Sequence, residues 1–463
     1  MKIKKIEVKK LFGIFDHQIP LVSDGNITIV IGENGLGKTV ILEAIDSLFN
    51  NRFDYFKSID FELFTITFDN DEFWRIEKKI SSGDLFLHIT RLDGKIKPKP
   101  ELGVRAKSDA LLKPAKIKIE KNVEKKANED LERKYFRDLE LMQYLDSDND
   151  KDFKSIKEEY EYINLKRLEM KYRRNIYFHS QFDEVDTNSR PKWFMETLDK
   201  VNVKLIETQR IITANDTGGN SYVNSVQKCS AELLKMITDA VKASSDITSG
   251  LDSSYPNRLI NKLRQGTIDT FEELNDALKT LDNRRKMLSS VGLGVDTQDS
   301  DILQIDETQT DLINLLKLYI DDSHEKLKPF DALSIKLKLF QDIINKRFKH
   351  KELQISRGSG LVFRSTVKKN KKDEFELMPA SKLSSGEQNE LILFYKLIFN
   401  SQQGDMILID EPELSLHISW QNEFIADLKD VTSINNVTII IATHSPDIIN
   451  DNWGLRVKLR GVE

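Results

Sequence analysis

A glycine-rich loop near the start of the chain has the composition needed to hold a nucleotide phosphate. Residues 32–39 read Gly-Glu-Asn-Gly-Leu-Gly-Lys-Thr and follow a β-branched apolar run at 27–31 that is typical of a buried parallel strand. Glycines let backbone N–H groups turn toward phosphates, the lysine reaches the β- and γ-phosphates, and the hydroxyl can ligate Mg²⁺. This pattern is that of a P-loop. Its phosphate-binding residues are therefore expected to be Gly32, Glu33, Asn34, Gly35, Leu36, Gly37, Lys38 and Thr39.

Two adjacent carboxylates occur far downstream, directly after a second apolar run at 406–409. Asp410 and Glu411 would lie at the carboxyl edge of a parallel sheet, where ligands of α/β proteins bind. Because phosphoryl transfer needs mainly positioning and charge neutralisation, we expect Asp410 to hold Mg²⁺ through water and Glu411 to polarise the attacking water. A solvated acidic turn closed by Pro412 is the alternative.

A histidine follows a third apolar run, at 437–442, in the sequence Thr-His-Ser. A histidine at the end of a buried strand is often only a satisfied polar group. Because His444 comes shortly after the two carboxylates in the chain, we expect it to act in catalysis as a sensor of the γ-phosphate.

Taken together, these motifs resemble the ABC-type heads of SMC-like and overcoming-lysogenization-defect-like ATPases. Residues 383–387, Leu-Ser-Ser-Gly-Glu, resemble the ABC signature, which in that family binds the γ-phosphate held by a partner subunit. Ser384 and Gly386 match the contact positions, whereas Ser385 stands where glycine is usual and Glu387 where glutamine is common. The segment 414–417 matches the D-loop. The resemblance implies ATP and Mg²⁺ as cofactors and a site shared between two copies of the chain.

The same resemblance implies a glutamine that senses the metal and the water. Segment 203–210, Val-Lys-Leu-Ile-Glu-Thr-Gln-Arg, resembles the strand that leads into the Q-loop and makes Gln209 the expected metal residue. Gln181, which follows an apolar run at 176–178, is the rival. The Thr-Gln-Arg ending fits this branch of ATPases better.

Composition limits the classes of protein. The 463 residues include one cysteine, so no internal disulfide can form and a reducing cytoplasm is expected. No export signal and no apolar run long enough to cross a membrane occurs. The net charge of −5, from 70 basic and 75 acidic residues, is not that of a general nucleic-acid coat protein. Five lysines between residues 2 and 10 are expected on an exposed strand edge, where lysine blocks unwanted pairing. Direct nucleic-acid binding stays open.

The order of these elements predicts an α/β fold, with an ATPase head split by two mainly helical insertions. A highly charged segment at 115–174 carries a helical apolar stripe and is expected to form a short coiled-coil-like hairpin. The expected parts are a head segment with the P-loop at 1–114, the hairpin at 115–174, a return to the head with the Q-loop at 175–215, a helical insertion at 216–345, and a head segment with the signature at 346–463.

Within the second insertion, Pro256 is expected near the first turn of a new helix, because proline is accepted there. Apolar residues at 312, 315, 316, 319 and 320 predict one amphipathic face, and those at 333, 337, 340 and 344 predict another. Such faces are more often internal packing than ligand-binding surfaces.

A narrower resemblance rests on the start at 11–17 (Leu-Phe-Gly-Ile-Phe-Asp-His), on Glu-Thr-Gln-Arg at 207–210 and on the signature. These segments are similar to the ATPases of bacterial anti-phage systems, AriA of PARIS and, as the near rival, PtuA of Septu. The resemblance implies a homo-oligomer, at least a dimer of heads, that holds a separate nuclease and responds to a phage-encoded trigger protein. The nuclease would be Toprim-like in PARIS and HNH-type in Septu. We expect it on another polypeptide, because too few residues follow His444 for a Toprim domain.

Two other classes stay open. A DNA-repair ATPase of the SMC or RecF kind would share every nucleotide-site residue and act directly on DNA. Short predicted arms and net acidity disfavour it, since phosphate binding relies on basic residues. The ATPase subunit of a membrane transporter would lack such long helical insertions.

Overall fold

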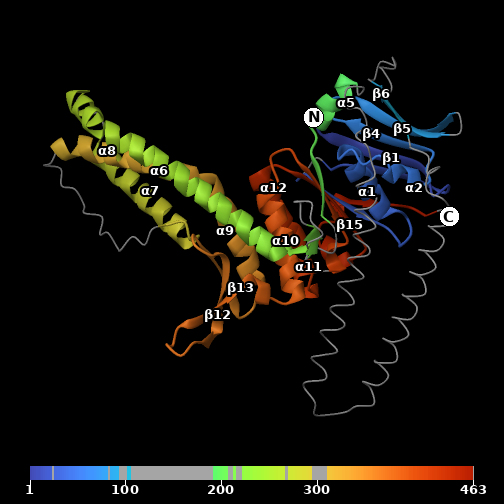
Figure 1. Ribbon diagram of the computed structural model, residues 1–463. Helices are drawn as coiled ribbons and strands as arrows, with labels where there is room; N and C mark the ends of the chain where they lie inside the picture. Colours follow the sequence, from blue (N-terminus) through green and yellow to red (C-terminus); the bar gives the residue numbers. More distant parts are fainter. Residues whose placement is uncertain are drawn as a thin grey trace, which may run out of the picture.

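A parallel sheet of five strands forms the centre of the head in the computed structural model (Figure 1). Its order is β16-β3-β15-β14-β8, and every neighbouring pair is parallel. The three strands predicted at 27–31, 406–409 and 437–442 are confirmed. The strands are β3 (Ile27–Ile31), β8 (Val203–Ile206), β14 (Met406–Asp410), β15 (Thr438–Thr443) and β16 (Arg456–Lys458). The structure describes residues 1–22, 25–81, 84–92, 102–105, 191–206, 212–214, 222–265, 270–294, 310–414 and 416–461.

The two faces of this sheet belong to different hydrophobic cores. Alternate side chains such as Ile407 and Ile439 pack in the core that contains helices α10 (Ser385–Phe399) and α12 (Phe424–Asn435). Their neighbours Leu408 and Ile440 pack in the core of helix α1 (Lys38–Phe49). Both faces are covered, which explains why these strands are continuous apolar runs.

An antiparallel sheet of six strands covers the other side of α1, in the order β2-β1-β4-β5-β6-β7. The prediction that the N-terminal lysines lie on an edge strand is wrong, because β1 pairs with β2 on one side and β4 on the other. Ile6 and Val8 of β1 are buried, and Lys9 and Lys10 are exposed. The strands are β1 (Ile3–Leu11), β2 (Phe15–Pro20), β4 (Leu63–Phe68), β5 (Phe73–Ser81), β6 (Asp84–Leu92) and β7 (Leu102–Arg105).

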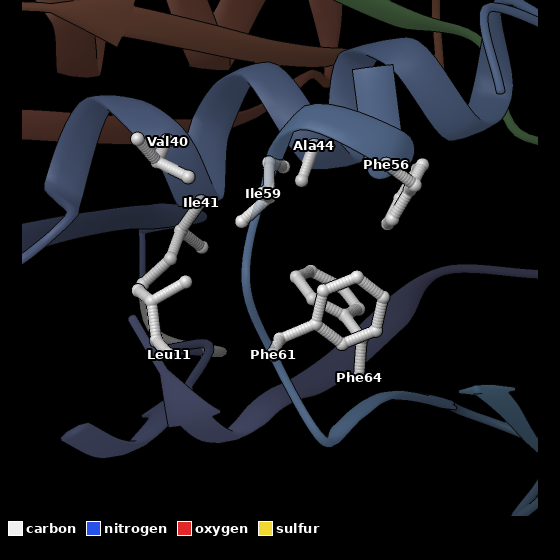
Figure 2. A pocket seen from close by; sticks show the side chains of 8 residues that line it. All are labelled: Leu11, Val40, Ile41, Ala44, Phe56, Ile59, Phe61 and Phe64. Carbon is white, nitrogen blue, oxygen red and sulfur yellow. The ribbon is translucent and has the colours of Figure 1, made fainter. Parts of the chain in front are cut away.

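Apolar side chains fix α1 on this sheet. Figure 2 shows Val40, Ile41 and Ala44 of α1 facing Leu11 of β1 and Phe64 of β4. Phe56, Ile59 and Phe61, from helix α2 (Tyr55–Ser58) and the segment after it, complete this apolar layer, which leaves no space for a water molecule. The helix that follows the P-loop is therefore held by close packing.

Three helices extend away from the head (Figure 1). They are α6 (Ser225–Gln265), α7 (Phe271–Ser290) and α8 (Thr310–Leu327). Leu274 and Leu281 of α7 pack against Ile313 and Ile320 of α8. The predicted face on α8 is thus partly wrong, because Leu315 and Tyr319 are exposed, whereas the unpredicted Ile313 is buried.

Helix α9 (Asp331–Arg347) leads back to the head, and its Leu337, Phe340 and Ile344 are buried, as the second apolar face predicts. The predicted boundary at residue 345 falls inside this helix.

Three antiparallel strands, β11 (Lys351–Ser356), β12 (Gly360–Lys369) and β13 (Phe375–Pro379), then precede the signature. The remaining elements are α5 (Lys192–Leu198), β9 (Ile212–Ala214), β10 (Tyr222–Asn224), α11 (Ile418–Gln421), α13 (Pro446–Ile449) and the 3₁₀ helices η2 (Lys328–Phe330), η3 (Ala380–Lys382), η4 (Pro412–Leu414) and η5 (Trp453–Leu455).

Pro256 does not begin a helix, and that prediction is wrong, because the residue lies inside α6. Proline removes one backbone donor and crowds the preceding turn. Here the Ser254 hydroxyl donates to the Gly250 carbonyl at 2.9 Å. Arg258 donates to the Leu251 carbonyl at 2.8 Å and pairs with both carboxylate oxygens of Asp322 on α8. Hydrogen bonds from side chains within α6 and the ion pair with α8 therefore stabilise the helix around the proline.

Several predictions fall outside the described residues. They are the charged hairpin at 115–174, the Q-loop glutamine Gln209 and its rival Gln181. The division of the chain into five parts also stays a prediction. A search of the described helices finds none with the length and apolar character needed to cross a bilayer.

A buried ionic cluster joins α9 to the head helices. Arg347, at the end of α9, pairs with Glu390 of α10 at 2.9 Å and with Asp427 of α12, and its guanidinium lies 4.5 Å from the centre of the Phe394 ring. Arg347 is 2% exposed and Glu390 is fully buried. Burial raises the pKa of both carboxyl groups, and the arginine opposes this shift. Removing the cation would therefore leave two buried acids uncompensated.

We predict that Arg347→Ala lowers the free energy of unfolding by about 3–5 kcal/mol, the usual cost of breaking a buried ion pair from one side. Denaturant unfolding followed by circular dichroism measures the change. The matched control is the neighbouring Lys346→Ala, because Lys346 pairs with Glu423 where both side chains are exposed. The control should lose less than about 1 kcal/mol. Equal losses in the two variants would contradict the structural role of the cluster.

Candidate nucleotide-binding site

The loop between β3 and α1 has the conformation of a phosphate cradle. Gly35 and Gly37 have φ angles of 87° and 85°, in the left-handed region that glycine adopts without strain. A Cβ on Gly37 would lie 2.4 Å from Cδ2 of Leu11 on β1. The loop is therefore packed against the β1–β2 turn, and position 37 accepts only glycine.

Lys38 lies over the same loop. Its Nζ donates to the carbonyl oxygens of Gly32 at 2.8 Å and Glu33 at 3.0 Å, and the residue is 6% exposed. Burial lowers the pKa of the ammonium, while Glu411, Asp410 and Glu413 oppose the shift. The lysine is thus held as a cation between the loop and a group of carboxylates.

The Thr39 hydroxyl donates to the carboxylate of Asp410, at 3.0 Å to each oxygen. These residues are 371 positions apart in the chain. Burial raises the pKa of Asp410 to about 6, with Glu411, Glu43 and Glu413 adding to the shift and Thr39 opposing it. Such a crowded, buried acidic group is stabilised by a cation.

A hydroxyl and one carboxylate fit the chemistry of Mg²⁺, which prefers one or two protein oxygens and completes its shell with water and phosphate. Among the described residues no group of three or more His, Cys, Asp or Glu side chains could hold a metal ion by itself. Thr39 and Asp410 therefore fit a magnesium ion that binds together with a nucleotide.

Glu411 follows β14 in a left-handed conformation, with φ of 42°, which is strained for a residue with a side chain. Its N–H donates to the Ala442 carbonyl at 2.9 Å, which continues the pairing with β15. Its carboxylate lies 3.0 Å from Nε2 of His444. Both side chains are partly exposed, at 25% and 33%. The predicted base and the predicted sensor are thus neighbours at the open edge of the sheet.

Glu413 is a site residue that sequence reasoning missed. Its Oε1 accepts the backbone N–H of His444 at 2.9 Å, and its Oε2 is buried without a hydrogen-bond partner among the described residues. Gln421 adds a second link, because it donates to the Leu416 carbonyl and accepts from the Ser445 hydroxyl at 2.7 Å. The segments after β14 and β15 are therefore tied together. The Glu-Pro-Glu spacing at 411–413 is the one sequence signal for this arrangement.

His17 of β2 was also missed. Its Nε2 lies 2.8 Å from the carbonyl oxygen of Leu36 in the P-loop, and the ring stacks on Phe15. The residue is 3% exposed, and its Nδ1 is buried with no hydrogen-bond partner in the described part of the chain. Burial lowers the pKa of the ring. The neutral ring that donates from Nε2 therefore fits this position and supports the P-loop from behind.

The signature residues lie at the N-terminus of α10. Ser384 is the N-cap, and its side chain and backbone form a capping box with Glu387. A Cβ on Gly386 would meet no atom within 4 Å, so this turn has an open surface. Within the described chain, no hydrogen bond or ion pair joins Ser384 or Gly386 to Lys38 or Thr39. The described hydrogen bonds and ion pairs therefore connect the P-loop to Asp410, and Glu411 and Glu413 to His444.

We predict that His17→Phe weakens ATP binding about tenfold, because it keeps the stacked ring but leaves the buried Leu36 carbonyl without its donor. His17→Gln keeps a donor of similar reach and should recover most of the affinity. Isothermal titration calorimetry with ATP measures both, and thermal unfolding checks that both variants fold. Equal ATP affinities in the two variants would show that the hydrogen bond does not position the loop.

Comparison with known proteins finds a short similarity to one curated protein and distant similarities to solved structures. The thiamine import ATP-binding protein ThiQ of Ruegeria sp. (strain TM1040) is 36% identical over 72 residues, which cover 16% of this chain and 29% of that protein. The Smc head domain of Pyrococcus furiosus, solved with an extended coiled coil and bound to the C-terminal domain of ScpA, has 12% identity and a TM-score of 0.33, covering 99% of this chain and 94% of its own. The SMC head domain from Thermotoga maritima has 11% identity and a TM-score of 0.31, covering 97% and 93%.

A family model described as an AAA ATPase domain matches residues 1–449. This range includes the P-loop, Asp410, Glu411 and His444. The chain therefore belongs to the AAA ATPase domain family and is a P-loop ATPase.

Proposed function

We propose that the chain hydrolyses ATP to ADP and phosphate at a site that a second copy of the chain completes. The observation that carries this proposal is the hydrogen bond between Thr39 and Asp410, with the Glu411–His444 pair beside it. A P-loop hydroxyl and the carboxylates of a distant strand meet where the γ-phosphate and its metal would lie. Such a set serves phosphoryl transfer to water.

Each residue has a distinct role in this proposal. Lys38 would exchange its loop carbonyls for phosphate oxygens, and Thr39 with Asp410 would hold Mg²⁺, which would supply positive charge beside the phosphates. Glu411 polarises the attacking water, and His444 orients Glu411 and senses the γ-phosphate. Gln209 is proposed as a further metal residue on the resemblance alone.

Two exposed apolar side chains support a second copy. Leu414, the first residue of the D-loop, and Ile418, directly after its last residue, are 67% and 66% exposed. Ser384 of the signature is also exposed. Large apolar side chains beside a functional site are typical of a surface that a partner buries. A two-fold dimer would place the signature of each chain over the nucleotide of the other, and larger assemblies would be built from dimers.

We further propose that this ATPase is the scaffold and sensor subunit of an anti-phage system in the cytoplasm. The support is the resemblance of its motifs to AriA of PARIS, with PtuA of Septu as the rival. The helices α6, α7 and α8 provide a surface far larger than nucleotide binding requires. The partners would be a separately encoded nuclease, Toprim-like or HNH-type, and a phage-encoded trigger protein.

The alternative is a DNA-repair ATPase of the SMC or RecF kind that acts directly on DNA. It would use the same nucleotide site. The net charge of −5 disfavours a large contact with DNA phosphates.

We predict that Glu411→Gln slows ATP turnover at least about 100-fold while ATP stays bound, since the substitution removes the base and retains the phosphate contacts. The variant should form a dimer with ATP and Mg²⁺ in size-exclusion chromatography with light scattering. Lys38→Ala should lose ATP binding and remain without this dimer. Normal turnover by Glu411→Gln would contradict the role of that residue.

Mixing two inactive variants tests whether the site is shared. Ser384→Arg places a bulky cation in the signature, and Lys38→Ala damages the P-loop. A mixed dimer has one composite site with neither lesion, so ATPase activity should return on mixing. Failure to recover activity, with subunit exchange confirmed by differently tagged chains, would argue against a shared site.

We predict that the purified chain alone does not cut DNA and binds DNA weakly, and that a nuclease co-elutes when it is expressed from its own operon. Mass spectrometry of the eluate identifies the partner, and fluorescence anisotropy with duplex DNA measures binding. Tight, sequence-independent DNA binding without a co-eluting nuclease would favour the repair alternative.

A further inference from the structure

We propose that Lys351 is a positioning residue of the shared site. It neutralises the signature residue Glu387, and this allows Ser384 to bind the phosphate held by the second copy. The inference rests on the proposed shared ATP site and adds a residue that neither the motifs nor the family match indicates.

The Ser384 hydroxyl is already engaged in the free chain. It donates to Oε2 of Glu387 at 2.8 Å, and the Ser384 backbone N–H donates to the same oxygen at 2.9 Å. The Glu387 N–H donates back to the Ser384 oxygen at 3.4 Å. A phosphate oxygen that accepts the hydroxyl proton must therefore take the place of Glu387 as its acceptor.

Lys351, the first residue of β11, holds the carboxylate of Glu387. Its Nζ lies 2.7 Å from each carboxylate oxygen. The two side chains are 24% and 15% exposed, so this pair is less hydrated than most surface pairs. Burial raises the pKa of Glu387, but hydrogen bonds from Lys351 and Ser384 outweigh it and lower the pKa overall. Glu387 is therefore a carboxylate at neutral pH.

A carboxylate at this position opposes the binding of a phosphate at Ser384. Both anions would compete for one hydroxyl proton within hydrogen-bond distance, and like charges repel strongly at a partly buried site. Lys351 removes most of this repulsion, because its ammonium contacts both oxygens of the carboxylate. It also holds the carboxylate in place while the hydroxyl rotates toward the phosphate.

The position of Lys351 is set by buried structure. Four residues earlier, Arg347 makes its ion pair with Glu390, which lies on α10 three positions after Glu387. The connection between α9 and β11 thus binds α10 at two successive carboxylates on one side of the helix. This distinguishes the pair from exposed pairs such as Lys338–Asp342, whose side chains are 51% and 57% exposed.

The test measures ATP-dependent dimerisation in the full-length chain that carries Glu411→Gln, with Mg²⁺ present. Lys351→Met in this background should raise the ATP concentration needed for half-maximal dimerisation at least tenfold, because Glu387 is then unpaired. Adding Glu387→Gln to Lys351→Met should recover most of that loss, since the amide keeps the helix cap and removes the charge. Lys338→Met is the matched control and should leave the midpoint unchanged.

The outcomes separate the two proposals. If the Glu411→Gln parent does not dimerise with ATP, the shared site itself is wrong. If the parent dimerises and Lys351→Met matches it, the role of Lys351 is overturned. A loss in Lys351→Met that Glu387→Gln does not recover would also overturn it, because a merely structural lysine predicts that result. Thermal unfolding of each variant confirms that the folded chain is compared.

Discussion

The parallel alignment of β3, β15 and β14 is the constraint on which the site depends. The pairs Ile31–Thr443 and Asp410–Ala442 set the ends of the three strands at one edge of the sheet. The P-loop, the carboxylates and His444 follow directly from these ends. A change of register would separate Thr39 from Asp410, so backbone hydrogen bonds over the whole sheet determine a contact between two side chains.

Charge is concentrated at this edge. Asp410, Glu411 and Glu413 lie close enough to Lys38 to affect its pKa, and Glu43 adds to the shift at Asp410. One lysine cannot balance these acids, and burial makes the imbalance costly. A divalent cation bound together with the nucleotide phosphates would offset part of this negative charge.

The connection from α9 to β11 extends the site into the rest of the molecule. Helix α9 follows the three extended helices through η2, and its last residue, Arg347, is anchored in the core that also contains α10. Lys351 then contacts the first turn of α10, where the signature lies. Buried ion pairs are sensitive to small displacements because they lose much of their energy when the geometry changes. This connection therefore joins the extended helices to the signature through one segment of the chain and one ion pair.

The sequence by itself determined the P-loop, the strands β3, β14 and β15, and the position of Asp410 and Glu411 at the end of β14. These features depend on short patterns of apolar, glycine and charged residues. Only the tertiary structure decided the partners that lie far apart in the chain, such as Leu36 for His17, His444 for Glu413 and Glu387 for Lys351. It also decided that Pro256 lies inside a helix and that β1 is a central strand. Local patterns specify local elements, whereas the choice of a distant partner depends on how those elements pack.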